Sequence, residues 1–362
     1  MQVLVDTFFD NQPNGHGGNR RTAQIAKLVE RANLEVVQFE RTFLKTPRER
    51  YLAGLSAIAN PKTYFFIAKH RLNVARSLTG LSFCGFQRKL YEQVLEKHTG
   101  SPVLLWEATK NYIAPYVAKE KGFKVCALPH NLESLVPNQA AFFESLSTEA
   151  NALAKADIVF CISREETWFL RLSGANAHYL PYYPPKAIVD QLIEIRQARK
   201  TTSNDRFLIV GGAGNPPTRQ GMIEQITWLK QLRQQIEFQV DIVGFKTESL
   251  TSYCDVNITV HGAVSTEQLS KFMTHAKAAL VHQTPSSGAL TRIPEMLVAG
   301  IPVIANRNAC RSAFDYAGIH CYESIIELLN LMQQPLEVFE IPPPPIAAEK
   351  HFIDCLQKLA NH

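Results

Sequence analysis

The feature that most constrains the fold is an alternation of short apolar runs with stretches of helical periodicity along the whole chain. The first half contains the apolar runs MQVLVDTFF, LEVVQF, PVLLWEA, FKVCALPHN and ADIVFCIS. The second half repeats the pattern with DRFLIVGG, FQVDIVG, NITVHG, KAALVHQT and IPVIAN, and helices are expected over about 220–235, 265–275 and 290–299. Strands that alternate with helices predict parallel sheets, and continuous apolar runs indicate that both sheet faces are covered. We therefore expect an α/β fold of two doubly wound domains.

The length of 362 residues also favours two domains over a single core. The boundary is expected in YLPYYPPKAIVD, because Pro181, Pro184 and Pro185 cannot lie in a central strand. This predicts an N-terminal domain of residues 1–183 and a C-terminal domain of residues 184–340. The run EIPPPP is expected to be a rigid spacer, and a terminal helix over 346–362 to pack back on the N-terminal domain.

Charge, cysteine content and the start of the chain bear on location and partners. A net charge of +5 permits an acidic ligand or an anionic membrane surface but requires neither. The seven cysteines include no C-x-x-C pair, which is typical of a reduced, cytosolic protein without a zinc site. MQVLVDTFFD lacks the features of a signal peptide, and no apolar run is long enough to cross a membrane. We expect a cytoplasmic protein.

Ligands of open α/β sheets bind beyond the carboxyl ends of the strands, so the residues after each strand are the candidates for a site. After the first strand, Gly17 and Gly18 precede a helix and suit a close approach to phosphate, and a plain flexible loop is the alternative. The dinucleotide pattern G-x-G-x-x-G fails here, because Arg20 stands at its third glycine. It fails again in GGAGNPP, where Pro217 stands at the position of the third glycine. A nicotinamide-dependent enzyme is therefore not expected.

Three polar residues in the N-terminal half follow expected strands. His130 could bond to an anion or a sugar hydroxyl, or could cap a turn. Asp10, at the expected end of the first strand, and Glu107, at the end of PVLLWE, are the best carboxylates for a base that deprotonates an acceptor hydroxyl. Structural capping explains these two carboxylates equally well.

The C-terminal half offers a second group of candidates. Arg219, near an expected helix start, could bind phosphate bidentately or be solvated. Further on, Ser287 and Gly288 lead into a helix that carries Arg292 and, one turn later, Glu295. Free backbone N–H groups at such a helix start suit an anion, and the glutamate suits a ribose diol. An exposed surface glutamate is the alternative, but the apolar stretch MLVAGIPVIAN that follows favours burial.

Taken in order, these motifs resemble those of GT-B glycosyltransferases of the glycosyltransferase family 4 type. Such enzymes carry a glycine-rich loop, a late histidine in the first domain, A-D-x-V-x-x-I-S before the linker, and a final P…G…K/R-x-x-E-x-x-x-x-G-x-P-V motif. The matching segments are residues 15–18, His130, ADIVFCIS, HGAVSTEQL (261–269) and PSSGALTRIPEMLVAGIPV (285–303). The last segment is the most specific of these matches, and together they cover nearly the whole chain.

The resemblance implies two Rossmann-like domains facing a central cleft, and transfer of a sugar from a nucleotide-sugar to an acceptor hydroxyl. This would serve glycan, polysaccharide or glycolipid synthesis, with no metal and no cofactor besides the donor. It places His130 near the transferred sugar or the acceptor. The donor residues that it implies are Glu295 at the ribose, Arg292 and Arg219 at the diphosphate, Gly17 and Gly18 near the phosphates, and the backbone from Gly262 to Val264 near the base.

The chain departs from the family pattern at two places. Ser287 stands where the family has a second glutamate, and Gln220 replaces the second member of a basic pair with Arg219. The first departure leaves the donor sugar open. It also weakens the expectation that the anomeric configuration is retained. A nucleotide-sugar epimerase and a catalytically inactive GT-B binding module therefore remain as alternatives.

The segment 41–100 is basic, with eleven Lys and Arg against three Glu, and aromatic residues are interleaved with the charges. It could form an acceptor groove or a surface that meets anionic lipid, in which case the protein would be peripheral to a membrane. A solvated basic helical face is the alternative. No nucleic-acid-binding module accompanies the charge, so nucleic acid is not an expected partner.

Overall fold

The computed structural model describes residues 1–13, 15–40, 46–74, 78–100, 102–108, 112–136, 145–202, 205–337 and 339–361, and only the backbone of residues 47, 50 and 51. The chain forms two compact units. Unit 1 comprises Met1–Asn11, Ile25–Pro181 and Pro345–His362, and unit 2 comprises Gln12–Gln24 and Tyr182–Pro344. The glycine-rich segment before and within the first helix thus belongs to unit 2, whereas the sequence groups it with residues 1–183.

Unit 1 is built on a six-stranded parallel sheet in the order β2-β1-β3-β4-β5-β6. Its strands are β1 (Gln2–Asp6), β2 (Glu35–Gln38), β3 (Val103–Trp106), β4 (Lys124–Ala127), β5 (Ile158–Cys161) and β6 (Ala177–Tyr179). Alternate residues of the strands enter different cores: Leu104 and Val125 pack on one side of the sheet, and Val103 and Cys126 on the other. Both faces are therefore covered, as the continuous apolar runs predict.

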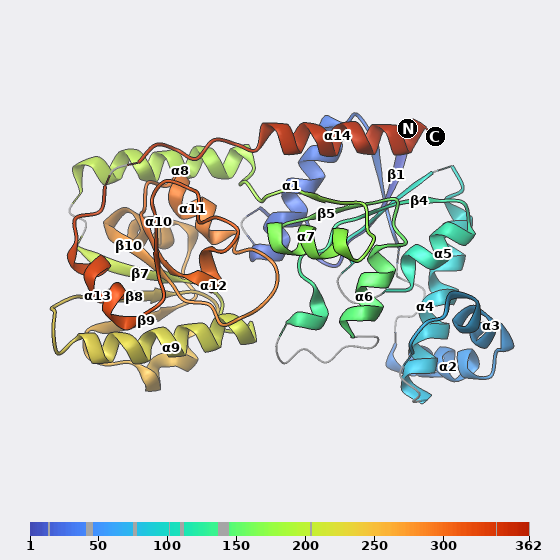
Figure 1. The fold of residues 1–362 in the computed structure, drawn as a ribbon, viewed down its shortest axis with the longest axis horizontal. Helices are drawn as coiled ribbons and strands as arrows, with labels where there is room; N and C mark the ends of the chain where they lie inside the picture. Colours follow the sequence, from blue (N-terminus) through green and yellow to red (C-terminus); the bar gives the residue numbers. More distant parts are fainter. Residues whose placement is uncertain are drawn as a thin grey trace. The chain divides into compact units, whose positions relative to one another are not determined.

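Helices of unit 1 cover this sheet and form a cluster of three beside it, made of α2, α3 and α4 (Figure 1). The last helix, α14, packs on the sheet, where the Phe352 ring meets Phe160 of β5 edge-on at 4.9 Å. The helices are α1 (Gly17–Arg31, which begins in unit 2), α2 (Pro47–Ile58), α3 (Pro61–His70), α4 (Leu78–Lys97), α5 (Ala114–Glu120), α6 (Leu146–Leu153), α7 (Arg164–Leu172) and α14 (Ile346–Asn361), with a short 3-10 turn η1 (Glu133–Leu135).

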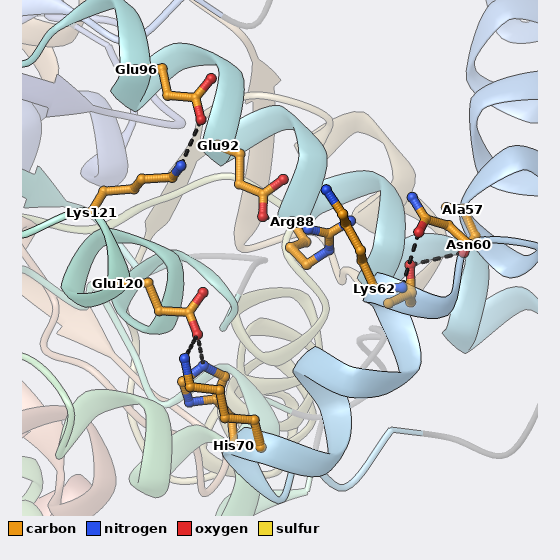
Figure 2. Close-up of polar contacts among 11 residues, drawn as sticks. Ala57, Asn60, Lys62, His70, Arg88, Glu92, Glu96, Glu120 and Lys121 are labelled. Carbon is orange, nitrogen blue, oxygen red and sulfur yellow. Dashed lines mark hydrogen bonds and ion pairs between the residues drawn. The ribbon is translucent and has the colours of Figure 1, made fainter.

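The described part of the basic segment 41–100 folds as α2, α3 and α4, and Figure 2 shows how local polar contacts fix these helices. The side chain of Asn60 caps α3 by accepting a hydrogen bond from the backbone N–H of Lys62 at 3.0 Å. His70, at the end of α3, contacts Glu120 of α5 at 2.8 Å, and Lys121 reaches Glu96 of α4 at 2.6 Å. Part of the basic charge is thus neutralised inside unit 1, whereas Arg41, Lys45 and Arg76 lie outside the described residues.

Unit 2 repeats the architecture, with a six-stranded parallel sheet in the order β12-β11-β10-β7-β8-β9. Five of its strands match expected apolar runs. The edge strand β12 does not, because His320 and Cys321 interrupt its apolar character. The strands are β7 (Arg206–Val210), β8 (Val240–Val243), β9 (Ile258–Gly262), β10 (Ala276–Val281), β11 (Val303–Asn306) and β12 (Ile319–Tyr322).

Helices expected over 220–235, 265–275 and 290–299 correspond to α9, α10 and α11 of unit 2. Local capping explains where some helices begin: Ser265 and Gln268 form a reciprocal capping box at α10, and Ser324 and Glu327 form another at α13. The helices are α8 (Lys186–Ala198), α9 (Pro216–Leu232), α10 (Thr266–His275), α11 (Arg292–Val298), α12 (Arg307–Cys310) and α13 (Ile325–Gln333), with 3-10 segments η2 (Arg199–Thr201) and η3 (Thr247–Tyr253).

Among the described residues, no helix is both long enough and apolar enough to pass through a bilayer.

The contact between α9 and the end of β10 depends on Gly221. A Cβ atom at this position would lie 2.2 Å from the carbonyl oxygen of His282, which is backbone and cannot move aside easily. We expect Gly221→Ala to lower the free energy of unfolding by about 1–3 kcal/mol, as overpacking does. Urea denaturation, followed by the fluorescence of unit 2, measures this free energy.

Gly214→Ala is the matched control in the same unit, since its added Cβ would meet only ordinary side-chain contacts with Lys246 and Phe245. Equal stability of the two variants would show that α9 does not need glycine for its approach to β10.

Candidate functional site

The carboxyl edge of the unit 2 sheet has a switch point between β7 and β10. The chain passes from β7 to β8 and β9 on one side, and β10, β11 and β12 lie on the other. Ligands of open α/β sheets bind at such a point. The residues that follow these two strands are Gly211 and Gly212 after β7, and His282 and Gln283 after β10. They define where a ligand of unit 2 is expected.

Arg292, the first residue of α11, lies over the end of β7. Its Nη1 atom is only 2.6 Å from where a Cβ of Gly211 would be, so the guanidinium packs directly over this glycine. Its Nε atom is buried without a hydrogen-bond partner. Burial lowers the pKa of Arg292 to about 10, which still leaves the group charged at neutral pH. A buried charged donor without an acceptor is uncommon in proteins, and here it suits an anionic ligand.

Glu295, one turn along α11, is only 3% exposed, so the alternative of a surface glutamate is wrong. Its Oε1 accepts a hydrogen bond from the Tyr182 hydroxyl at 2.7 Å, and its Oε2 forms an ion pair with Nη1 of Arg20. The Nε of Arg20 donates in turn to the carbonyl oxygen of Gly15 at 2.8 Å. Both carboxylate oxygens are thus engaged by residues of unit 2, and a ribose would have to displace one of these partners.

The pKa values of these groups follow from their burial. Desolvation lowers the pKa of the Arg20 guanidinium from its ordinary value. Burial also raises the pKa of the Tyr182 hydroxyl, against the opposing charge of Arg20. Tyr182 therefore remains a neutral hydrogen-bond donor to Glu295 at physiological pH.

Glycine-rich segments lie next to α11. A Cβ on Gly17, the first residue of α1, would lie 3.0 Å from the hydroxyl oxygen of Thr291, and the backbone N–H of Gly18 donates to His16. Gly288 has φ +78°, a conformation that favours glycine, and its carbonyl oxygen accepts a hydrogen bond from Arg311. Ser287 beside it is partly exposed. The structure therefore brings Gly17, Gly288 and Arg292 into one region of unit 2.

Arg219, Gly262 and Val264 lie around the loops that follow β7, β8 and β9. The guanidinium of Arg219, in the first turn of α9, lies 5.8 Å from the ring centre of Tyr253. Gly262 has φ +72°, and Val264 is packed partly against the core. Arg219 and Arg292 are both positively charged hydrogen-bond donors, so only a shared anion could link them. A joint role at a diphosphate stays a prediction.

In unit 1 the structure brings together two of the three expected catalytic residues. Glu107 is buried directly after β3, and its Oε2 accepts hydrogen bonds from the backbone N–H groups of Phe8 at 2.6 Å and Phe9 at 3.3 Å. Its Oε1 lies 3.3 Å from Nε2 of His130, and the rings of His130 and Phe9 are 5.1 Å apart. A carboxylate in this position orients the imidazole, which can then exchange a proton with a ligand.

Asp10 does not end the first strand, which is a correction to the sequence interpretation. β1 ends at Asp6, because the chain leaves the sheet before the apolar pair Phe8 and Phe9, and Asp10 is exposed in the following loop. The buried carboxylate at the strand end is Asp6, which accepts a hydrogen bond from the Tyr91 hydroxyl.

Two buried glutamates hold the loop that carries His130. Glu149 of α6 accepts hydrogen bonds from the backbone N–H groups of Glu133 at 2.7 Å and Ser134 at 3.0 Å, and Glu166 of α7 accepts one from Leu132 at 3.2 Å. Burial raises the pKa of Glu149, although these hydrogen bonds oppose the change. Sequence reasoning missed Glu149, as well as Arg20 and Tyr182 in unit 2, because no motif marks residues that act through distant partners.

The family resemblance in the sequence predicts that no metal is bound. Within the part of the chain that the structure describes, no three His, Cys, Asp or Glu side chains are grouped so as to hold a metal ion. Independence of metal stays a prediction.

Comparison with known proteins identifies the fold and no closer relationship. No protein-family model matches the chain, and neither does any curated protein. Sucrose-phosphate synthase from Thermosynechococcus elongatus is similar over 99% of this chain and 93% of its own, with 15% identity and a TM-score of 0.60. HepE from Anabaena, solved with UDP, is similar over 99% of this chain and 100% of its own, with 13% identity and a TM-score of 0.60.

The UDP-GlcNAc 2-epimerase from Methanocaldococcus jannaschii is also similar, over 99% of this chain and 100% of its own, with 12% identity and a TM-score of 0.54. At such identities the similarity establishes the fold alone. With its two six-stranded parallel sheets, the chain has the GT-B fold of two Rossmann-like units.

The hydrogen bond from Tyr182 to Glu295 can be tested by Tyr182→Phe. This change leaves a buried carboxylate oxygen without its donor, so we expect the free energy of unfolding to fall by about 1–3 kcal/mol. Chemical denaturation measures it. Tyr183→Phe is the control, since the half-buried Tyr183 hydroxyl donates to an uncharged acceptor, the backbone carbonyl oxygen of Pro342, and not to a carboxylate. An effect no larger than the control would remove Tyr182 from the group that holds Glu295.

Proposed function

We propose that the chain is a glycosyltransferase of the family 4 type, which transfers a sugar from a nucleotide-diphosphate-sugar to an acceptor hydroxyl. The observation that carries the proposal is the buried, unpartnered Nε of Arg292 over Gly211, at the switch point of the unit 2 sheet. The fold supports the same conclusion, since Anabaena HepE has this fold and was solved with UDP and with UDP-glucose.

Donor binding is proposed to centre on α11. Arg292 would bind the diphosphate, and Glu295 would exchange one of its present partners for the ribose diol. The exchange with Arg20 is the simpler one, because Arg20 would then be released beside the phosphates that Gly17 and Gly18 approach. The remaining donor contacts in this proposal are Arg219 at the diphosphate, Gly262 to Val264 at the base, and Ser287 and Gly288 at the sugar.

In the transfer, the bond between the sugar C1 and the diphosphate oxygen breaks, and a bond from C1 to the acceptor oxygen forms. Negative charge develops on the departing diphosphate, and Arg292 stabilises it without a metal or another cofactor. The acceptor proton passes to a base. In unit 1 the His130–Glu107 pair is the best-formed candidate, because the two side chains lie 3.3 Å apart and are buried. Asp10 remains an exposed alternative.

The position of Ser287 bears on two open properties of the proposed transfer, the identity of the donor sugar and the anomeric configuration of the product. A serine cannot make the charged contact that the second family glutamate would, so donor selection is proposed to differ here. Retention of configuration is proposed on the resemblance alone. An epimerase, like the Methanocaldococcus enzyme of the same fold, would instead release or rearrange the sugar without an acceptor. Product analysis by mass spectrometry and NMR distinguishes the two activities.

Arg292→Ala tests the proposed donor site. Loss of a charge-assisted contact to phosphate costs about 1.5–3 kcal/mol, so we expect the dissociation constant for UDP, or for the nucleotide that the wild type prefers, to rise at least about tenfold. Calorimetry measures it. Arg233→Ala is the control, since Arg233 pairs with Asp255 on the surface. Unchanged affinity in the Arg292 variant, or no nucleotide binding by the wild type, would contradict the proposal.

A lipid-linked acceptor is proposed on account of the α2–α4 cluster. Exposed basic side chains alternate with exposed apolar ones. On α2, Arg48, Leu52 and Leu55 share one helical face, and on α3, Lys62 and Phe65 share one. Such a surface suits contact with an anionic bilayer, which would make this a cytoplasmic protein peripheral to a membrane.

The membrane contact predicts that the Leu52→Ser/Phe65→Ser variant sediments with phosphatidylglycerol vesicles several-fold less than the wild type, because apolar burial adds to electrostatic attraction. The Val256→Ser/Ile326→Ser variant is the control, since these two apolar side chains are also exposed but belong to unit 2. If both variants sediment with the vesicles as much as the wild type does, or if the wild type does not sediment with them, the cluster is merely a solvated basic surface.

A further inference from the structure

Two cysteines of unit 2 lie in contact. The sulfur of Cys310, the last residue of α12, is 3.3 Å from the sulfur of Cys321 in β12. The contact joins a four-residue helix to the strand at the edge of the unit 2 sheet, whose partner among the described strands is β11. A disulfide bond requires sulfurs about 2.05 Å apart, and side-chain rotation with a small backbone adjustment can supply the difference.

The two thiols differ in environment in the way that an ordered exchange reaction requires. Cys310 is buried, and burial raises its pKa to about 12, so its thiol is a poor nucleophile toward a molecule in solution. Cys321 is exposed on the edge strand, so a small disulfide can reach it. The exposed thiol can therefore react first, and the buried thiol lies within reach to resolve the product.

We propose that Cys310 and Cys321 are a modification site that forms a reversible disulfide with a low-molecular-weight disulfide as oxidant. The Cys321 thiol loses its proton and its sulfur attacks one sulfur of the small disulfide; the disulfide bond of the oxidant breaks, a mixed disulfide forms, and the released small thiolate takes up the proton. The Cys310 sulfur then attacks the Cys321 sulfur, and the second small thiol leaves with the proton from Cys310. Two protein thiols become one disulfide, and the oxidant becomes two thiols.

The disulfide would tie α12 covalently to β12, in addition to the core packing of Ala309 and Cys310 and to polar contacts at the two ends of the helix. Asn306 caps the helix at Ala309 and bonds to both backbone groups of Gln283, at 3.0 Å and 2.9 Å. After the helix, Arg311 donates to the carbonyl oxygen of Gly288. The clamped helix thus adjoins the segment proposed to bind the donor, so oxidation regulates the donor site. This last step rests on the proposed function, whereas disulfide formation does not.

Incubation of the full chain with oxidised glutathione tests the proposal. After alkylation of free thiols and digestion without reduction, we expect a peptide pair linked through Cys310 and Cys321, which disappears when dithiothreitol is added first. Hydrogen exchange of residues 307–311 should slow in the oxidised form. Two results would overturn the proposal: glutathione that stays on Cys321 without internal exchange, or no reaction at either cysteine.

Three variants sharpen the assignment. Cys310→Ser should stop at the mixed disulfide on Cys321, and Cys321→Ser should leave Cys310 unmodified. Cys355→Ser should behave as the wild type, because Cys355 is half-buried in unit 1 beside His351. A cross-link that persists in either of the first two variants would contradict the assignment.

UDP affinity separates this proposal from the proposed function. We expect the oxidised and reduced wild type to differ by about fivefold or more in dissociation constant. Equal affinities would remove the regulatory role but leave the disulfide. Absence of UDP binding in both forms would count against the donor site itself.

Discussion

The parallel arrangement of both sheets is the constraint on which the rest of the molecule depends. Parallel strands need crossovers, and the crossover helices cover both faces of each sheet, so polar side chains have little place inside. Ligand-binding residues are then left to the carboxyl ends of the strands. In unit 2 the strand order reverses between β7 and β10, and Arg292 and Glu295 are presented there by the short helix α11. The burial that builds the fold also desolvates these two charges.

Desolvation explains why the contacts of Glu295 and Arg292 differ. The carboxylate of Glu295 is compensated on both oxygens, by Tyr182 and Arg20, whereas the Nε of Arg292 is compensated by no described group. A protein seldom retains an uncompensated buried donor unless a ligand completes it. We therefore interpret Glu295 as part of a site that is already formed in unit 2, and Arg292 as the group that would bind an anion.

Periodicity in the sequence was sufficient for most of the fold, because ten of the strands are the expected apolar runs. It missed the edge strands β6 and β12, whose histidines make them less apolar than central strands. It also extended the first strand through Phe8 and Phe9, which are apolar but already outside the sheet, and so misplaced Asp10. An edge strand needs less apolar surface, so its pattern can be too weak to detect, although the edge strands β2 and β9 are apolar enough to be predicted.

The site was predictable only where a local motif marks it. Arg292, Glu295 and Gly288 lie in one short segment, and the structure confirms that Glu295 is buried. Arg20 and Tyr182 reach Glu295 from 275 and 113 residues away, which no local pattern can reveal. Glu107 and His130 were each expected, but their contact depends on the neighbouring positions of β3 and β4 in the sheet.

The most direct test of the central claim is a crystal structure with a nucleoside diphosphate bound. The account predicts a phosphate oxygen within hydrogen-bond distance of the Nε of Arg292, and a ribose hydroxyl in place of Arg20 on Glu295. A nucleotide bound elsewhere, with Arg292 still lacking a partner and Glu295 still paired to Arg20, would contradict it.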